Sequence, residues 1–425
     1  MIFMIKPHKT DAILNAYDIA KQRYAALGVN TDFVIQEVQT IPVSLHCWQG
    51  DDVRGFEQLE NVVSQNMVTG SYPGAARNAD ELRSDIEHAF QLSPCKHRVN
   101  LHSMYAEPAK PKERNALTAD DFSHWIQWAK EKGLGLDFNA SFFTHPMLNS
   151  GFSLSSRDAA VRDYWVQAGI GARQIADQIG RDLGTPCINN IWIPDGMKDI
   201  PANRMIYRQN LLDSLNRILE EHYERTHMMD VLEGKLFGIG LESFTVGSHE
   251  FYLAFAASHG VGVCMDTGHY HPTESVADKV SAVIPFVDPI MLHVSRGIRW
   301  DSDHVLIQSD ELTGLMLEVK RAGLFHKVHI GLDYFDASIN RVAAWAIGLR
   351  AAGKALLTAL LEPSHLLEEA EANGDYTARL ALMEEMKNLP VNAVWERLCL
   401  QTGCPIVATW MEDIREYEQS ILSKR

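Results

Sequence analysis

Residues 261–293 read VGVCMDTGHYHPTESVADKVSAVIPFVDPIMLH, and this stretch decides the fold. It contains two short apolar runs, VGVCMD at 261–266 and IMLH at 290–293, which are typical of strands covered on both faces. Between them lies enough chain for a loop and a helix, the connection that two parallel strands require. The stretch therefore predicts a strand–helix–strand unit in which each strand ends on an ionisable residue.

The same unit recurs on both sides of this stretch. The candidate strands are residues 42–46, 98–102, 134–138, 188–193, 229–233, 261–266, 290–293 and 329–333. Eight consecutive strand–helix units predict an α/β fold, the (β/α)8 TIM barrel. A doubly wound open sheet is the competing fold, but it usually has fewer strands and often carries a GxGxxG loop, which this sequence lacks.

Helical patterns precede and follow the predicted barrel. Residues 11–27 carry apolar side chains at helical spacing and predict an opening helix. The last part of the chain predicts successive helices at residues 354–361, 364–372, 376–389, 391–401 and 409–423. We therefore expect a catalytic barrel with an N-terminal helix, residues 1–352, and a C-terminal helical extension, residues 353–425. The extension is expected to make subunit contacts, and packing within its own chain is the alternative.

The composition is that of a globular protein with excess negative charge. The 425 residues are 46% hydrophobic and 22% charged, with 39 Lys and Arg against 55 Asp and Glu, a net charge of -16. This acidic balance argues against binding to nucleic acid. No apolar run approaches the ~18 residues of a membrane span. The six cysteines are scattered without a CxxC motif, so we expect reduced thiols and a cytoplasmic protein that contacts no membrane.

Ionisable residues dominate the ends of the predicted strands, which face the open mouth of a barrel. The eight end residues are His46, His102, Asp137, Trp192, Glu233, Asp266, His293 and Asp333. The last four come from successive strands, and their three carboxylates would repel one another unless a positive charge lay among them. A divalent cation with oxygen and nitrogen ligands is the simplest solution. The alternative is that each carboxylate is paired separately with Lys, Arg or backbone N–H.

Two further motifs point to a second ion. His269 follows Asp266 in the sequence DTGH, where Gly268 permits the chain to turn back over the strand end. Asp301 and Asp303 are two residues apart, so their side chains would point the same way if the segment is extended. A pair of this kind in a loop is also common as a simple turn element, which is the alternative.

Four other residues are candidates for contact with a substrate. Lys235 could carry a proton with a depressed pKa, donate to a substrate oxygen, or simply form a salt bridge. His102 could bind substrate hydroxyls or catalyse ring opening. Trp192 and Trp48 could pack on the apolar face of a sugar, although a tryptophan beside a strand is more often part of the core. The barrel phosphate loop is not visible after the last two strands, which favours an uncharged sugar or polyol.

Long motifs in this chain closely resemble those of the L-rhamnose isomerase family. They occupy residues 42–52 (PVSLHCWQGDD), 190–199 (NIWIPDGMKD), 235–240 (KLFGIG), 266–273 (DTGHYHPT), 292–305 (LHVSRGIRWDSDHV), 329–341 (HIGLDYFDASINR) and 374–382 (GDYTARLAL). The resemblance thus spans essentially the whole chain. It implies a (β/α)8 barrel, a homotetramer, a cytoplasmic location and the interconversion of L-rhamnose and L-rhamnulose in L-rhamnose catabolism.

The same resemblance implies two divalent ions per subunit, typically Mn²⁺, with Zn²⁺ or Co²⁺ as options in one site. The first, structural ion would be held by Glu233, Asp266, His293 and Asp333. The second, catalytic ion would be held by His269, Asp301 and Asp303, with Glu233 as a possible bridge.

The expected reaction moves hydrogen between C1 and C2 of an open-chain sugar. A metal-assisted 1,2-hydride shift is the favoured route, and a cis-enediol with a carboxylate base is the rival. A water near Lys235 and Asp333 would move the proton between O1 and O2, and His102 is the third candidate catalytic residue. A metal-dependent hydrolase or sugar-phosphate epimerase on the same barrel, and a barrel that only binds a partner, are the alternatives.

Overall fold

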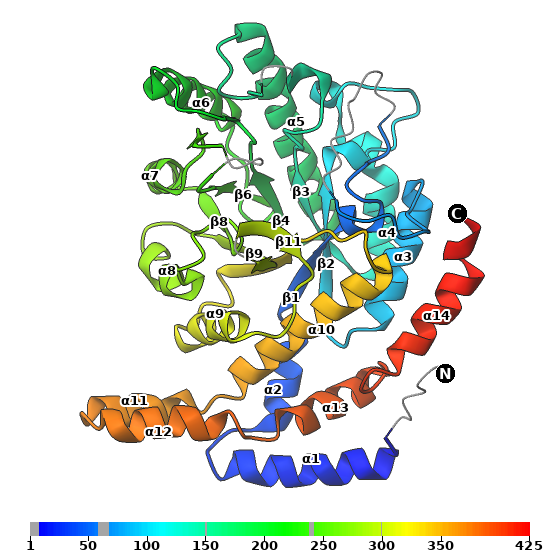
Figure 1. Cartoon of the computed structure of the whole chain (residues 1–425), viewed down its shortest axis with the longest axis vertical. Coiled ribbons are helices and arrows are strands. Elements are labelled where there is room, and N and C mark those ends of the chain that lie inside the picture. Colours follow the sequence, from blue (N-terminus) through cyan, green and yellow to red (C-terminus); the bar gives the residue numbers. More distant parts are fainter. Residues whose placement is uncertain (1–7, 58–67, 149–150, 238–241, 299) are drawn as a thin grey trace.

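The computed structural model describes residues 8–57, 68–148, 151–237, 242–298 and 300–425. The remaining stretches of the predicted barrel domain lie outside the described residues. Eight parallel strands close into a barrel in the order β1-β12-β9-β8-β6-β4-β3-β2 (Figure 1). Their bounds are β1 Pro42–His46, β2 Lys96–His102, β3 Gly135–Asn139, β4 Cys187–Ile191, β6 Met228–Glu233, β8 Gly262–Asp266, β9 Ile290–Val294 and β12 Val328–Leu332. The predicted fold and all eight predicted strands are confirmed.

Helices follow the strands and surround the barrel (Figure 1). This alternation buries the strands on both sides, which explains their apolar sequences. The helices are α1 Thr10–Ala25, α2 Thr31–Val38, α3 Ala79–Gln91, α4 Ser123–Lys132, α5 Ala159–Leu183, α6 Arg204–Ile218, α7 His249–His259, α8 Val276–Val283, α9 Asp310–Arg321, α10 Arg341–Leu360, α11 Ser364–Ala372, α12 Tyr376–Met386, α13 Val391–Thr402 and α14 Trp410–Ser420.

Two small antiparallel sheets form in the connections that leave the carboxyl ends of strands. The first pairs β5 (Gly196–Met197) with β7 (Phe244–Thr245). The second is the hairpin of β10 (Arg296–Ile298) and β11 (Trp300–His304), which follows β9 directly. This hairpin brings the predicted ligand Asp301 back towards the barrel.

Asp137 does not lie at a strand end, contrary to the sequence-based expectation. β3 continues to Asn139, and the Asp137 carboxylate is paired inside the barrel with Arg98, at 2.8 Å from Nη2 to Oδ1. Ser44 Oγ and the backbone N–H of Ile188 donate to the same carboxylate, at 2.6 Å and 3.0 Å. Asp137 is therefore a buried structural residue. Its pairing with Arg98 and a backbone N–H is the alternative to a metal site that the sequence left open for the strand-end carboxylates.

The C-terminal helices continue from the barrel without a break at the predicted boundary. Residue 353 falls within α10, which begins at Arg341 and packs on α9 and β1. α11 and α12 form a hairpin that projects from the barrel, and α13 packs against α1 (Figure 1). α1 buries Ile13, Tyr17, Ala20 and Tyr24, the apolar face that its sequence predicts.

α10 also has the length and mean hydropathy, 1.2 over its most apolar window, that would let a helix cross a membrane. However, 78% of that window is buried inside the structure. A central helix of a large core has the same composition, so this helix is weak evidence for a membrane span.

Candidate metal centre

The predicted ligands form one layer above an apolar layer of the barrel. Ile188, Val231, Cys264 and Met291 come from four neighbouring strands and form a separate buried cluster. Side chains two residues apart point to the same side of a strand. Asn190, Glu233, Asp266 and His293 each lie two residues further along these strands, so they occupy the next layer towards the mouth.

The first group joins Glu233, Asp266, His293 and Asp333, whose ligand atoms all lie within 4.8 Å of one another. His293 Nδ1 lies 3.0 Å from Asp333 Oδ2, 3.3 Å from Glu233 Oε2 and 3.9 Å from Asp266 Oδ2. All four residues are buried. The structure thus brings together the four side chains proposed for the structural ion.

The second group joins Asp266, His269 and Asp301, again with ligand atoms within 4.8 Å of one another. His269 Nε2 lies 3.3 Å from Asp301 Oδ2 and 3.9 Å from Asp266 Oδ2. The other ring nitrogen, Nδ1, lies 3.2 Å from the Gly234 carbonyl oxygen. A carbonyl only accepts, so Nδ1 carries a proton in this contact and Nε2 is the ring nitrogen that can bind an ion.

The geometry at Asp303 differs from the expectation of an extended pair. Asp303 has φ 42°, in the left-handed region, so the simple alternation of an extended strand does not hold there. Within the described residues its carboxylate belongs to no ligand group of the kind formed by His269 and Asp301. Burial raises the pKa of Asp303 well above its usual range, and the nearby charges of Asp301, Asp333 and Asp266 add to this effect. Its role as a ligand therefore stays a prediction.

The titration of the buried groups shows a site with too much negative charge. Burial raises the pKa of Asp266, and Asp333 and Glu233 act in the same direction, so that it reaches about 8 despite the opposing effect of His269. Burial lowers the pKa of His269, but Asp266 and Asp301 together outweigh that effect and the value is about 9. The pKa of His293 is likewise raised, against the effect of burial, by Glu233 and Asp333 among others. The pKa values of Glu233, Asp301 and Asp333 are instead lowered against the effect of burial, chiefly by His293, His269 and His46 respectively.

Unpartnered polar atoms test whether these residues fit a metal ion. A buried polar atom without a partner costs free energy, about 1–3 kcal/mol. Among the described residues, several atoms of both groups are buried without a hydrogen-bond partner: Asp266 Oδ2, Asp301 Oδ1, Asp333 Oδ1 and Nε2 of His293. These are oxygen and nitrogen donors suited to a borderline divalent ion such as Mn²⁺. The side chains of both ligand groups are therefore chemically suited to hold a divalent metal ion.

Lys235 forms the salt bridge that was one of its three possible roles. Its ammonium donates to Asp301 Oδ2, and the side chain is buried. Burial lowers its pKa, but Asp301 and Asp303 outweigh that effect and the pKa is raised. The expectation of a depressed pKa is therefore wrong in this arrangement, and Lys235 is a fixed positive charge. Its Nζ also lies 5.5 Å from the centroid of the Trp192 ring.

Aromatic rings line the barrel mouth beside the ligands. Trp48 and His102 stack at 4.3 Å between ring centroids, with 23° between their planes. Phe143 lies 5.7 Å from Trp192 and 6.1 Å from Trp48, and Phe335 lies 5.8 Å from Trp48. The three residues proposed for substrate contact, Trp48, His102 and Trp192, thus belong to one aromatic wall. Within the described residues, neither ring nitrogen of His102 has a hydrogen-bond partner.

Sequence reasoning did not assign a role to two other residues at the mouth. His46 is 1% exposed, with its Nε2 4.0 Å from Asp333 Oδ1, and it shares a possible ligand group with His293 and Asp333. Asn190 donates from Nδ2 to Glu233 Oε2. His46 was visible as a strand end. Asn190 could have been found from its position two residues after an apolar strand residue.

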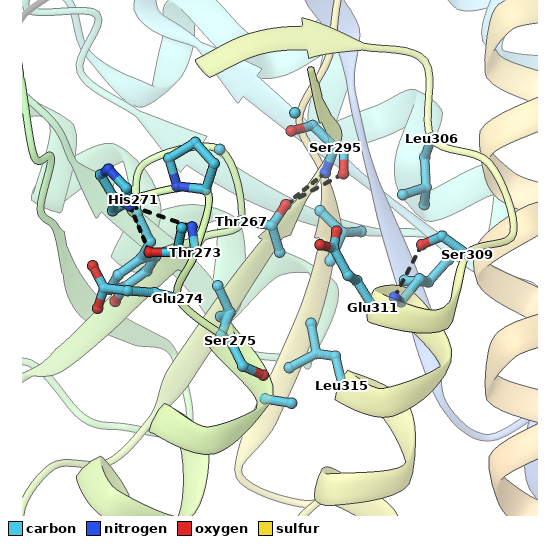
Figure 2. A pocket seen from close by; sticks show the side chains of 18 residues that line it. Thr267, His271, Thr273, Glu274, Ser275, Ser295, Leu306, Ser309, Glu311 and Leu315 are labelled. Atoms are coloured by element: carbon cyan, nitrogen blue, oxygen red, sulfur yellow. Dashed lines mark hydrogen bonds between the residues drawn. The ribbon is translucent and has the colours of Figure 1, made fainter. Parts of the chain in front are cut away.

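A pocket of about 310 Å³ is lined by residues on both sides of His269 in the sequence, among them Thr267, Gly268 and Tyr270 (Figure 2). Thr267 and Ser295 line it, and the Thr267 hydroxyl donates to Ser295 O at 3.3 Å and accepts from Ser295 N at 3.1 Å. The residues of the two ligand groups do not line this pocket. It is therefore separate from the candidate metal centre, although Thr267 and Gly268 lie between the ligands Asp266 and His269.

Comparison with known proteins finds relatives along almost the entire chain. A family model described as L-rhamnose isomerase (RhaA) matches residues 11–425. The L-rhamnose isomerase of Yersinia pseudotuberculosis serotype O:1b (strain IP 31758) is 52% identical over 417 residues, which are 98% of this chain and 100% of that protein. The L-rhamnose isomerase of Yersinia pestis is also 52% identical, over the same shares of the two chains.

The similarities to solved structures are weaker. D-psicose 3-epimerase from Clostridium cellulolyticum H10, determined with D-tagatose, aligns with a TM-score of 0.48 at 11% identity. The alignment covers 76% of this chain and 99% of that one.

Proposed function

The chain belongs to the L-rhamnose isomerase family, and from this premise we propose that it interconverts L-rhamnose and L-rhamnulose as an aldose–ketose isomerase of L-rhamnose catabolism. The observation that carries the proposal is the group of Glu233, Asp266, His293 and Asp333, with ligand atoms within 4.8 Å of one another in the barrel. Sugar isomerisation at C1 and C2 needs charge stabilisation next to two adjacent oxygens, which such a group can provide through a cation.

We propose two divalent ions per subunit, with Mn²⁺ as the metal and Zn²⁺ or Co²⁺ as options in one site. Glu233, Asp266, His293 and Asp333 would hold the structural ion. His269, Asp301 and Asp303 would hold the catalytic ion. Asp266 lies in both described ligand groups, which supports two ions sharing one carboxylate.

When bound, the ions would supply positive charge beside O1 and O2 of the open-chain sugar. The chain's own residues bind and orient that sugar. Trp48 and Trp192 offer apolar ring surface to its carbon face, and the unpaired ring nitrogens of His102 can bind hydroxyls or the ring oxygen during opening. Lys235 stays positive beside Asp301, so it can donate to a substrate oxygen. A water between Lys235 and Asp333 would move the proton between O1 and O2.

The hydrogen on C2 would pass to C1 as a hydride, while the hydroxyl proton moves from O2 to O1. No hydrogen at carbon is then exchanged with water. In the rival enediol route, a carboxylate removes the C2 hydrogen as a proton, and exchange with water follows. L-rhamnose deuterated at C2 separates the two routes. We expect deuterium at C1 of the L-rhamnulose product, and full loss of deuterium to solvent would eliminate the hydride shift.

Metal removal tests the function directly. Protein treated with a chelator and dialysed should lose turnover of L-rhamnose, and Mn²⁺ should restore it, because three neighbouring carboxylates cannot stabilise a developing alkoxide without a cation. The assay is ketose formation from L-rhamnose, with phosphorylated aldoses as the control panel. Undiminished activity in metal-free protein, or turnover of sugar phosphates alone, would contradict the proposal.

We further propose a cytoplasmic homotetramer that binds neither nucleic acid nor a membrane. All six cysteines are free thiols, which supports a reducing compartment. α12 buries none of its described residues, and Tyr376 and Leu380 on it are 61% and 58% exposed. Exposed apolar side chains on a projecting hairpin support contact with another subunit.

A further inference from the structure

Two residues that belong to neither ligand group form hydrogen bonds to the backbone of His269. Its carbonyl oxygen accepts two hydrogen bonds, from Leu236 N at 3.2 Å and from Nε2 of His249 at 2.9 Å. A carbonyl oxygen can only accept, so His249 Nε2 carries the hydrogen and donates it. His249 is the first residue of α7 and is half-buried, which places a helix end against the loop that carries a proposed ligand.

The same imidazole ring packs on both segments that flank the site. It stacks on Tyr270, the residue after His269, with 4.0 Å between ring centroids and 8° between planes. It also lies close to Gly234, where an added Cβ would stand 2.8 Å from His249 Nδ1. Gly234 in turn accepts from His269 Nδ1 at 3.2 Å through its carbonyl oxygen. His249 therefore fixes the peptide after His269 and packs against the acceptor that orients the His269 ring.

The same loop also borders a cavity. Thr267, Gly268 and Tyr270 line the pocket of about 310 Å³ shown in Figure 2, so part of the loop borders open space. A loop that borders a cavity can shift at small cost unless other contacts hold it. His249 supplies a hydrogen bond and a ring stack on that loop.

We propose that His249 is a positioning residue for the proposed catalytic ion, acting through the His269 carbonyl and the Tyr270 ring. The inference rests on the proposed function, because it concerns the ion that His269 and Asp301 would hold. Partners that orient a metal-binding histidine typically change metal affinity by about 10-fold to 100-fold when they are removed. His249 contacts none of the atoms proposed to bind an ion. Its replacement should therefore shift the position of His269 without changing which side chains bind the metal.

The test compares three variants with the intact protein loaded with Mn²⁺. His249→Phe keeps a flat ring on Tyr270 and removes the donor. His249→Gln keeps an amide donor of similar reach. His259→Phe is the matched control, since His259 ends the same helix and stacks on Phe255 at 3.8 Å between centroids. The readouts are Mn²⁺ affinity, from electron paramagnetic resonance titration of the dialysed protein, and the Mn²⁺ concentration that gives half-maximal activity.

For His249→Phe we expect the affinity for the more weakly held Mn²⁺ to fall about 10-fold or more, with kcat largely recovered at saturating Mn²⁺. His249→Gln should lie nearer to the intact protein, and His259→Phe should match it. Equal Mn²⁺ affinity in His249→Phe and His259→Phe would overturn the proposal, as would equal losses in His249→Phe and His249→Gln. If His249→Phe does not fold, His249→Asn, whose amide is too short to reach, takes its place. An intact protein that binds no Mn²⁺ would instead overturn the proposed function.

Discussion

Asp266 is the residue on which the two ligand groups meet. Its Oδ2 lies 3.9 Å from His293 Nδ1 on one side and 3.9 Å from His269 Nε2 on the other. Glu233 also reaches both histidines, but it meets His269 at Nδ1, the nitrogen that donates to the Gly234 carbonyl. The ring nitrogen left for an ion therefore faces Asp266 and Asp301. This geometry favours Asp266 over Glu233 as the carboxylate shared between two ions.

Mn²⁺ binding should release protons and strengthen as pH rises. In the metal-free site the pKa of Asp266 is raised to about 8 and that of His269 to about 9, so this interacting pair holds protons at pH 7 that a cation must displace. Each displaced proton makes the affinity fall about tenfold per pH unit below these values. Calorimetric titration with Mn²⁺ at pH 7, in two buffers of different ionisation enthalpy, should report proton release. Injection of Mn²⁺ into buffer alone is the control, and affinity independent of pH between 6 and 8 would refute the expectation.

The strands show how far the sequence predicts the site. Glu233, Asp266 and His293 were predictable together, because the first two end their strands, His293 is the last residue but one of β9, and parallel strands end at the same mouth. Asp137 was wrongly predicted to lie at the mouth, because β3 runs two residues beyond it. Its partner Arg98 comes from the neighbouring strand β2, and a sequence pattern does not reveal how two strands are aligned.

Loop geometry and the contributions of loops were harder to predict. Spacing alone treats Asp301 and Asp303 as equivalent, but the positive φ of Asp303 breaks the alternation. Phe143 and Phe335 of the aromatic wall lie in segments that connect strands to helices. Such segments have no periodic pattern that would show which side chains point into the barrel mouth.

The Arg98–Asp137 pair of β2 and β3 should matter for stability more than for turnover. Arg98→Met would leave the Asp137 carboxylate buried without its cation, at a cost of about 3–5 kcal/mol. Arg98 now lowers the pKa of Asp137 against the effect of burial, and without it that pKa would rise. The loss should therefore be larger at pH 8 than at pH 5, since the charged carboxylate is the costly form. Urea denaturation at both pH values measures it.

A double variant provides the control for this prediction. Replacing both partners, as Arg98→Met with Asp137→Leu, removes the uncompensated charge and should recover most of the lost stability. An Arg98→Met protein as stable as the original at pH 8 would show that the pair contributes little to the fold.

At the scale of the whole molecule, the barrel and the helices after it are joined by one continuous element. α10 runs from the barrel past the predicted boundary and packs on α9, α3, α2 and β1 within the barrel and on α13 beyond it. The division at residue 353 therefore reflects a change in sequence pattern, whereas in the structure α10 crosses this position and packs on both parts. The α11–α12 hairpin is the part that projects from this body (Figure 1).

Assembly should depend on the α11–α12 hairpin. Leu380→Asp places a charge on an exposed apolar position of α12 and should lower the mass of the assembled protein in sedimentation or light scattering. Phe286→Asp, at an apolar position that is 73% exposed in the connection between α8 and β9, is the matched control and should leave the mass unchanged. A single-chain mass for the unaltered protein, or an unchanged mass for Leu380→Asp, would remove the hairpin from the proposed interface.

The contact between α1 and α13 has a consequence for biosynthesis. The apolar face of α1, including Tyr17 and Tyr24, is translated long before α13, which packs on it together with α2. Until α13 is made, this face has only the part of its native cover that α2 supplies, and the rest is open to chaperones or to premature association between nascent chains. A ribosome stalled before residue 391 should therefore carry a chain whose first helix is still accessible to a protease, whereas the released protein protects it.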